Sequence, residues 1–318
     1  MNLYSLYLKI IRMSEKYLIK KGLFRLALIA LIVNNIIIIT VSKVKPRMFS
    51  KENSEYSDFV KIELDFILKE LFYKTKEIKS EPSMESKILK LFSSLNIWAS
   101  PCSLDKLIAD RILIVGPGEF NYSEALNHDL EILLDPRLIN IKYKEDMRYV
   151  IVLNKACTQR DFDLIFDHAS NIQVEAILTK KWFPEFGKHQ NIFLFDPSDL
   201  IRLAPISGAP NLLPIILVGA SKWAPKSIQI LGCDFYLGKN NYRLNEKPDE
   251  VVLIMSSKPA WLDSLSLHNP FTQLSFLKTF NMYFKSKGID FITSLSSLNY
   301  LEMANRYNQK YSRKSHNY

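Results

Sequence analysis

Short apolar runs separated by helical segments fill the chain from residue 110 onward. Each run is bounded by turn residues, which is typical of a strand buried in a parallel sheet. Strands that alternate with helices indicate an α/β fold, here a Rossmann-like, mainly parallel sheet with flanking helices. The expected strands lie within residues 111–120, 149–154, 174–179, 191–195, 227–232, 251–255 and 291–295.

Three helices are expected between these strands, near residues 160–168, after a turn within 207–224, and from Pro270 to about Lys287. Asn269 and Pro270 form a good N-cap and first helical position, and Gly288 stops the helix.

An apolar segment at residues 23–41 precedes this domain. It is barely long enough to cross a bilayer, and Asn34 and Asn35 count against a span. It predicts either a membrane anchor or a buried or surface-lying hydrophobic helix. Basic residues flank both sides, with a slight excess before the segment that favours an N-terminus inside the cell.

Two helical patterns, at about residues 58–79 and 84–95, follow a charged linker at residues 42–57. They predict a stalk or a helical cap on the main domain. The expected division is an N-terminal basic and hydrophobic segment (1–42), a linker with stalk or cap (43–109) and a Rossmann-like domain (110–318).

The net charge of +9 suggests an anionic partner such as a phosphate, a nucleic acid or a lipid surface. Much of the excess lies at the two ends, and no basic helix is interleaved with aromatic residues. We therefore expect no nucleic-acid binding. The three cysteines lie far apart without a CxxC pair, which argues against a zinc site and a disulfide framework.

Two glycine-containing turns are candidate binding segments. Gly116 and Gly118 follow the first strand and would let the backbone approach a phosphate or ribose, or they simply allow a tight turn. Ser207 and Gly208 precede a helix whose N-terminus would suit a phosphate or a sugar carboxylate, or the serine only caps the helix.

The segment Asp161-Phe162-Asp163 has the spacing with which some glycosyltransferases hold a divalent cation. Acidic residues are also favoured in the first turn of a helix, where this segment falls. We prefer that second interpretation and expect no metal and no other cofactor.

The strand end GCDFYLGKNNY (232–242) carries more polar and aromatic residues than a strand needs. Tyr236 and Tyr242 either pack a half-buried loop or face a ligand. His268 stands just before a helix, where it is a loop residue or a general base.

In combination these residues resemble bacterial sialyltransferases of glycosyltransferase family 42. The resemblance implies that Tyr236 and Tyr242 bind the phosphate leaving group of a CMP-sugar, and that His268 deprotonates the acceptor hydroxyl. ISG (206–208) looks like the donor-contacting T-S-G segment of that family, and Asn154 matches an asparagine that contacts the nucleotide. The matching pieces span residues 111–300 in the order of the family, whose fold is a GT-A-like variant.

The resemblance implies inverting transfer of sialic acid, or a related nonulosonic acid, from a CMP-sugar donor to a glycan acceptor of lipooligosaccharide type or another galactoside. Two tyrosine hydroxyls would stabilise the leaving phosphate without a metal. Because CMP-sugars are usually met inside bacterial cells, the protein is expected to be membrane-associated, on the cytoplasmic face if it is bacterial. A lumenal face in a eukaryote is the alternative that stays open.

The chain departs from the family pattern at Pro117, where an asparagine would stand, and at Ala204, where some members have an arginine. Two alternatives therefore stay open. One is a transferase that uses another nucleotide sugar. The other is a membrane-tethered, non-catalytic binding protein on a transferase-like fold.

Overall fold

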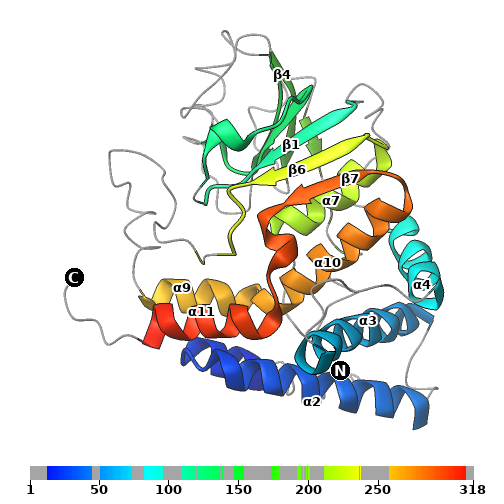
Figure 1. Ribbon diagram of the computed structural model, residues 1–318, viewed down its shortest axis with the longest axis vertical. Coiled ribbons are helices and arrows are strands. Elements are labelled where there is room, and N and C mark those ends of the chain that lie inside the picture. The colour runs from blue at the N-terminus through cyan, green and yellow to red at the C-terminus, as the bar shows by residue number, and fades with distance from the viewer. Residues whose placement is uncertain are drawn as a thin grey trace.

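The protein has an α/β fold with flanking helices and an N-terminal apolar helix, as the sequence predicts. Figure 1 shows the sheet at one end of the molecule and the N-terminal helices at the other, along its longest axis. The computed structural model describes residues 13–44, 51–73, 82–95, 109–118, 120–136, 138, 147–153, 173–179, 192–194, 196, 198, 200, 211–235, 237 and 258–312.

The sheet has seven strands in the order β5-β4-β3-β2-β1-β6-β7, and every neighbouring pair is parallel. Alternate side chains of β1, β2, β3 and β4 enter two apolar clusters, one on each face, so this part of the sheet is buried on both sides. The strands are β1 (Arg111–Val115), β2 (Leu130–Leu133), β3 (Arg148–Leu153), β4 (Gln173–Thr179), β5 (Ile192–Leu194), β6 (Ser227–Leu231) and β7 (Asp290–Thr293).

The strand order reverses at β1. From β1 the chain builds β2 to β5 outward on one side, and then returns to place β6 on the other side of β1. Open α/β sheets bind ligands at the carboxyl ends of the strands that flank such a switch point. In this protein those ends are Val115 and Leu231.

The sequence patterns predicted the strands other than β2. This strand contains Glu131, a buried carboxylate that accepts a hydrogen bond from the Tyr122 hydroxyl and lies 3.4 Å from His128 Nε2. The polar side chain interrupts the apolar run, and only its folded partners make its burial acceptable. The expected strand at 251–255 and helix at 160–168 lie outside the described residues.

Two helices cover one face of the sheet, α7 (Leu212–Lys222) and α10 (Pro270–Ser286). The start of α10 is confirmed: the Asn269 side chain accepts a hydrogen bond from Phe271 N at 3.1 Å. Two helices were not predicted, α9 (Lys258–Leu267) and α11 (Tyr300–Ser312).

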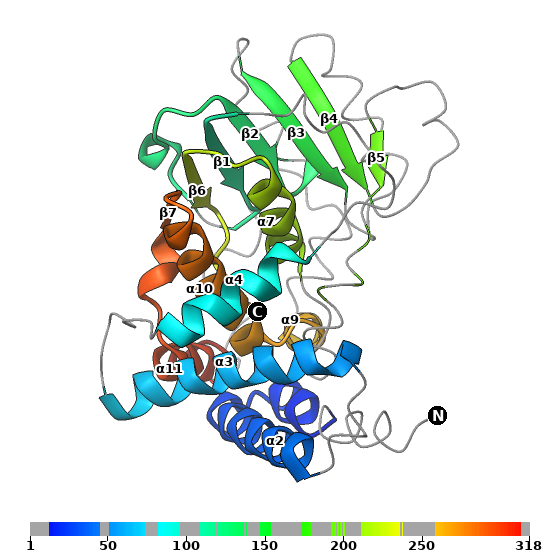
Figure 2. The ribbon, with the colours of Figure 1, turned by 90° about the vertical axis from the view of Figure 1, so that its right-hand side faces the viewer.

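The N-terminal helices α2 (Phe24–Val44), α3 (Lys51–Tyr73) and α4 (Pro82–Ser93) pack into the same apolar cluster as the sheet. Aromatic pairs join them to the C-terminal helices, with ring centroids 4.7 Å apart for Phe24 and Tyr307 and 4.6 Å apart for Phe59 and Phe276. In Figure 2, α3 lies between α2, which is below it, and the pair α4 and α10, which are above it. Because α3 begins at Lys51, the later part of the expected linker is helical. The domain division at residues 42 and 109 stays a prediction.

Within the described residues, α2 is the single helix long and apolar enough to cross a membrane. Asn34 and Asn35, which counted against a span, are buried in the protein. Asn34 Nδ2 donates to Glu15 Oε1 at 2.7 Å, and Asn35 Nδ2 donates to Glu63 Oε2 at 3.0 Å. Glu15 also accepts a hydrogen bond from Asn269 at 2.7 Å. The two amides therefore tie α2 to carboxylates on neighbouring helices.

Candidate active site at the carboxyl edge of the sheet

The turns after β1 and β6 pack directly on each other. Gly116 N donates to Leu231 O at 2.8 Å, and Gly118 N donates to Gly232 O at 2.7 Å. Gly232 has a φ of 65°, and a Cβ there would lie 2.2 Å from Gly116 O. This supports the tight-turn interpretation of the glycines. Both N–H groups already donate hydrogen bonds within the protein. A contact of Gly116 or Gly118 with a nucleotide-sugar substrate stays a prediction, and it must use other atoms of these residues.

The loop after β6 is fixed at its start. Leu237 N donates to Asp234 O at 3.0 Å, and the buried Phe235 has a left-handed φ of 50°. Tyr307 of α11 donates a hydrogen bond from its hydroxyl to the Phe235 carbonyl. Residues other than glycine rarely adopt a positive φ, so this hydrogen bond holds Phe235 in an uncommon conformation. Tyr236 and Tyr242 lie outside the described residues.

His268 lies between α9 and α10 and is half-buried. The next residue, Asn269, caps α10 through its side-chain oxygen and donates from its amide nitrogen to Glu15 Oε2. Both functions of the Asn269 side chain are therefore used, and they fix the backbone on which His268 stands.

The N-termini of α7 and α10 lie together on the carboxyl side of the sheet. Each helix leads directly into a parallel strand, β6 or β7, so each begins at the carboxyl edge and ends at the amino edge. Asn211 N, at the start of α7, donates to Gln273 Oε1 in the first turn of α10 at 3.2 Å. Gln273 is 1% exposed, and within the described residues its Nε2 and the Asn211 Oδ1 are buried without a hydrogen-bond partner. Ser207 and Gly208, which precede α7, lie outside those residues.

No protein-family model, curated protein or solved structure matches the chain. The chemistry of the carboxyl edge must therefore be inferred from the residues of this chain.

Lys310, one of the basic residues near the C-terminal end of the chain, lies near the loop after β6, and the sequence patterns gave it no role. Burial on α11 lowers the pKa of the Lys310 ammonium group, and the nearby Asp234 charge opposes that shift. The Asp234 carboxyl group in turn lies against Gly118, where a Cβ would approach its Oδ1 to 2.9 Å. The buried Tyr300, Met303, Tyr307 and Tyr311 at helical spacing could have revealed α11.

In the part of the chain that the structure describes, no group of three or more His, Cys, Asp or Glu side chains is arranged to hold a metal ion. Asp161, Asp163 and the candidate nucleotide-binding Asn154 lie outside that part. A reaction without a metal stays a prediction.

Proposed function

We propose that this protein is an inverting, metal-independent glycosyltransferase that transfers sialic acid, or a related nonulosonic acid, from a CMP-sugar to a glycan hydroxyl. The observation that carries the proposal is the convergence of three segments at the carboxyl edge. These are the loop after β6, the N-terminus of α7 and the N-terminus of α10. They are the segments that bear, or directly follow, the residues on which the sequence resemblance rests.

In the proposed reaction the acceptor oxygen attacks the anomeric carbon of the donor, and the bond from that carbon to the CMP phosphate oxygen breaks. His268 takes the proton of the acceptor hydroxyl. Tyr236 and Tyr242 donate hydrogen bonds to the departing phosphate, whose negative charge grows as the bond breaks. Asn154, Ser207 and Gly208 would bind the donor, with Gly116 and Gly118 beneath it.

The described residues support these roles by fixing backbone. The left-handed Phe235, held by Tyr307, sets the direction in which the chain reaches Tyr236. Asn269 does the same for His268. Such positioning matters because a catalytic group displaced by about 1 Å can lose about 100-fold in rate.

The test is release of CMP from CMP-sialic acid by the purified full-length chain with a galactoside acceptor, with and without EDTA. We expect release that EDTA leaves unchanged and that His268→Ala and Tyr236→Phe each reduce by at least about 100-fold. Tyr17→Phe is the matched control, since Tyr17 is 60% exposed on an N-terminal helix. Thermal unfolding of each variant confirms that it is folded.

Loss of activity in EDTA would contradict the metal-independent mechanism. Thermal stabilisation by CMP without any release would favour the non-catalytic binding protein, and release from a different nucleotide sugar would correct the donor. The absence of both CMP release and thermal stabilisation by CMP would overturn the proposal.

A further inference from the structure

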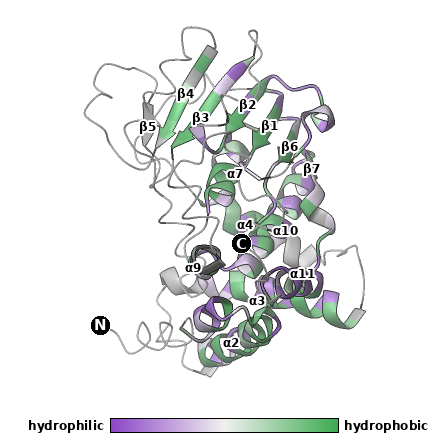
Figure 3. Cartoon of the chain, turned by 90° about the vertical axis from the view of Figure 1, so that its left-hand side faces the viewer, coloured by the Kyte–Doolittle hydropathy of each residue, from purple (hydrophilic) through white to green (hydrophobic). Residues whose placement is uncertain are grey.

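One face of α2 is apolar and exposed. Its large side chains Leu26, Ile29, Val33 and Ile36 are 50, 55, 47 and 47% exposed. They recur at intervals of three and four residues, so they lie along one side of the helix, which we call the outer face of α2. Figure 3 shows the hydrophobic α2 at the end of the molecule opposite the sheet.

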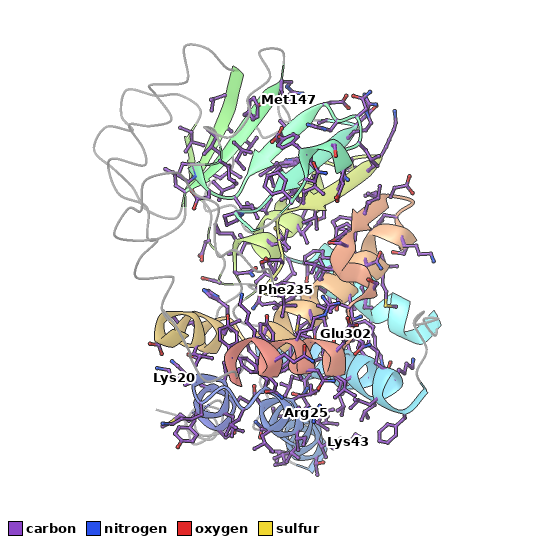
Figure 4. The ribbon with its side chains drawn as sticks, turned by 60° about the vertical axis from the view of Figure 1, so that its left-hand side comes forward. Lys20, Arg25, Lys43, Met147, Phe235 and Glu302 are labelled. Carbon is purple, nitrogen blue, oxygen red and sulfur yellow. The ribbon has the colours of Figure 1, made fainter. Side chains whose placement is uncertain are left out.

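Positive charge flanks the outer face of α2. Lys21 and Arg25 lie at its N-terminal end and Lys43 at its C-terminal end, and none of the three forms an ion pair within the described residues. Figure 4 shows Arg25 and Lys43 on the same side of the molecule as Lys20. The single acidic residue between residues 13 and 44 is Glu15, which is buried. Asp263 of α9 pairs with Lys20 at 2.5 Å, which leaves Lys21, Arg25 and Lys43 as the cations that favour an anionic surface beside the outer face.

The opposite side of α2 is occupied by protein. Asn34 and Asn35 bond to Glu15 and Glu63, and α3 and α11 pack along the helix. If α2 crossed a bilayer in this fold, charged residues of α3 such as Lys61 and Asp65 would enter the hydrocarbon with it, which is strongly unfavourable. Among the described residues of α2, the outer face is the side available to lipid.

A second copy of this chain is a poorer partner for the outer face. Cations stand at both ends of the helix, so two copies packed face to face, parallel or antiparallel, would bring like charges together. A surface of anionic lipids satisfies both the apolar side chains and the cations.

We propose that α2 lies in the plane of an anionic membrane surface, with its outer face in the interface and the rest of the protein on one side of the bilayer. The proposal does not depend on the transferase activity. It replaces a helix that crosses the membrane by one that rests on it.

The first test is flotation of the purified full-length chain with vesicles of phosphatidylcholine containing about one third phosphatidylglycerol. We expect binding that weakens in high salt and on vesicles of phosphatidylcholine alone. Ile29→Gln with Val33→Gln should weaken binding by at least about tenfold, and Arg25→Gln by about fivefold. Leu126→Gln, 54% exposed beside β6, is the matched control and should bind normally.

The second test places epitope tags at residues 1 and 318 and treats membranes from producing cells with protease. An in-plane α2 leaves both tags on one side, whereas a spanning α2 separates them. Separated tags, binding unchanged by the double substitution, no vesicle binding, or a stable dimer that the double substitution dissociates would each overturn the proposal.

Discussion

The hydroxyl of Tyr307 donates a hydrogen bond to the backbone carbonyl of Phe235 and so joins α11 to the loop after β6. The ring of Tyr307 stacks on Phe24, the first residue of α2. One side chain thus connects the N-terminal helices to the residue before Tyr236. The start of the loop after β6 is linked in this way to α2, which lies outside the Rossmann-like domain expected from the sequence.

Tyr307→Phe should keep the stacking and remove the hydrogen bond. We expect a loss of about 1 kcal/mol in the free energy of unfolding, and a larger proportional loss in the rate of CMP release, because the loop is less well fixed. Chemical denaturation and kcat measure the two effects. Tyr283→Phe is the control, since the described residues give the Tyr283 hydroxyl no hydrogen bond; equal effects of both variants would contradict the link to the loop.

Gly232→Ala should destabilise the protein more than Gly288→Ala. Both glycines have left-handed φ values, 65° and 71°, which alone make alanine unfavourable by about 1 kcal/mol. Only at Gly232 would the new Cβ meet backbone, at 2.2 Å from Gly116 O. We expect an additional loss of about 1–3 kcal/mol from that clash, measured by urea denaturation. Equal losses would show that the two turns can separate easily.

Glu63 should make stability depend on pH. Burial raises the pKa of the Glu63 carboxyl group, and hydrogen bonds from Asn35, Thr272 and Ser275 oppose the shift only in part. A pKa higher in the folded than in the unfolded state gives stability that is fully present below the unfolded value and is lost as pH rises through the folded value.

Glu63→Gln should therefore remove the part of the fall in stability that follows when pH rises above the usual value of 4.5. The free energy of unfolding is measured at several pH values from about 4.5 to 8. Glu302→Gln, an exposed partner of Arg306, is the control. A pH profile that Glu63→Gln leaves unchanged would assign the dependence to other groups.

Lys278→Met should cost far more stability than Lys226→Met. The Lys278–Glu70 ion pair, 2.6 Å long, has side chains only 10 and 8% exposed, so its loss leaves a buried carboxylate with a hydrogen bond from Tyr300 N but no counter-charge. The expected loss is about 3–5 kcal/mol. The Lys226–Asp110 pair is 77 and 57% exposed and should contribute at most about 1 kcal/mol. Thermal or urea unfolding measures the stability lost by each variant, and losses of similar size would contradict this prediction.

Much of the fold could be predicted because its signals are local. Buried strands such as β1 and β6 read as short apolar runs, and Asn269 with Pro270 marks a helix start within two residues. Gly232 opens the segment 232–242 that stands out in the sequence, and its φ of 65° lets the chain turn there.

What could not be predicted depends on partners that the chain brings together only by folding. Asn34 and Asn35 counted against a membrane span, and the sequence did not show that Glu15 and Glu63 would accept their hydrogen bonds inside the protein. Glu131 obscured β2 in the same way. The roles of Tyr236, Tyr242 and His268 rest on resemblance and chemistry, because a single sequence carries no record of the substrate.

The stacking of Phe24 on Tyr307 has a consequence for synthesis of the protein. In the finished fold α2 (Phe24–Val44) packs against α11 (Tyr300–Ser312), which is synthesised much later. At a synthesis rate of about 5–20 residues per second, the ribosome takes roughly 15–60 s to extend the chain from α2 to the end of α11. During that interval its inner apolar side chains lack their final partners. The packing of α2 on α11 therefore forms only after nearly all of the chain has been synthesised.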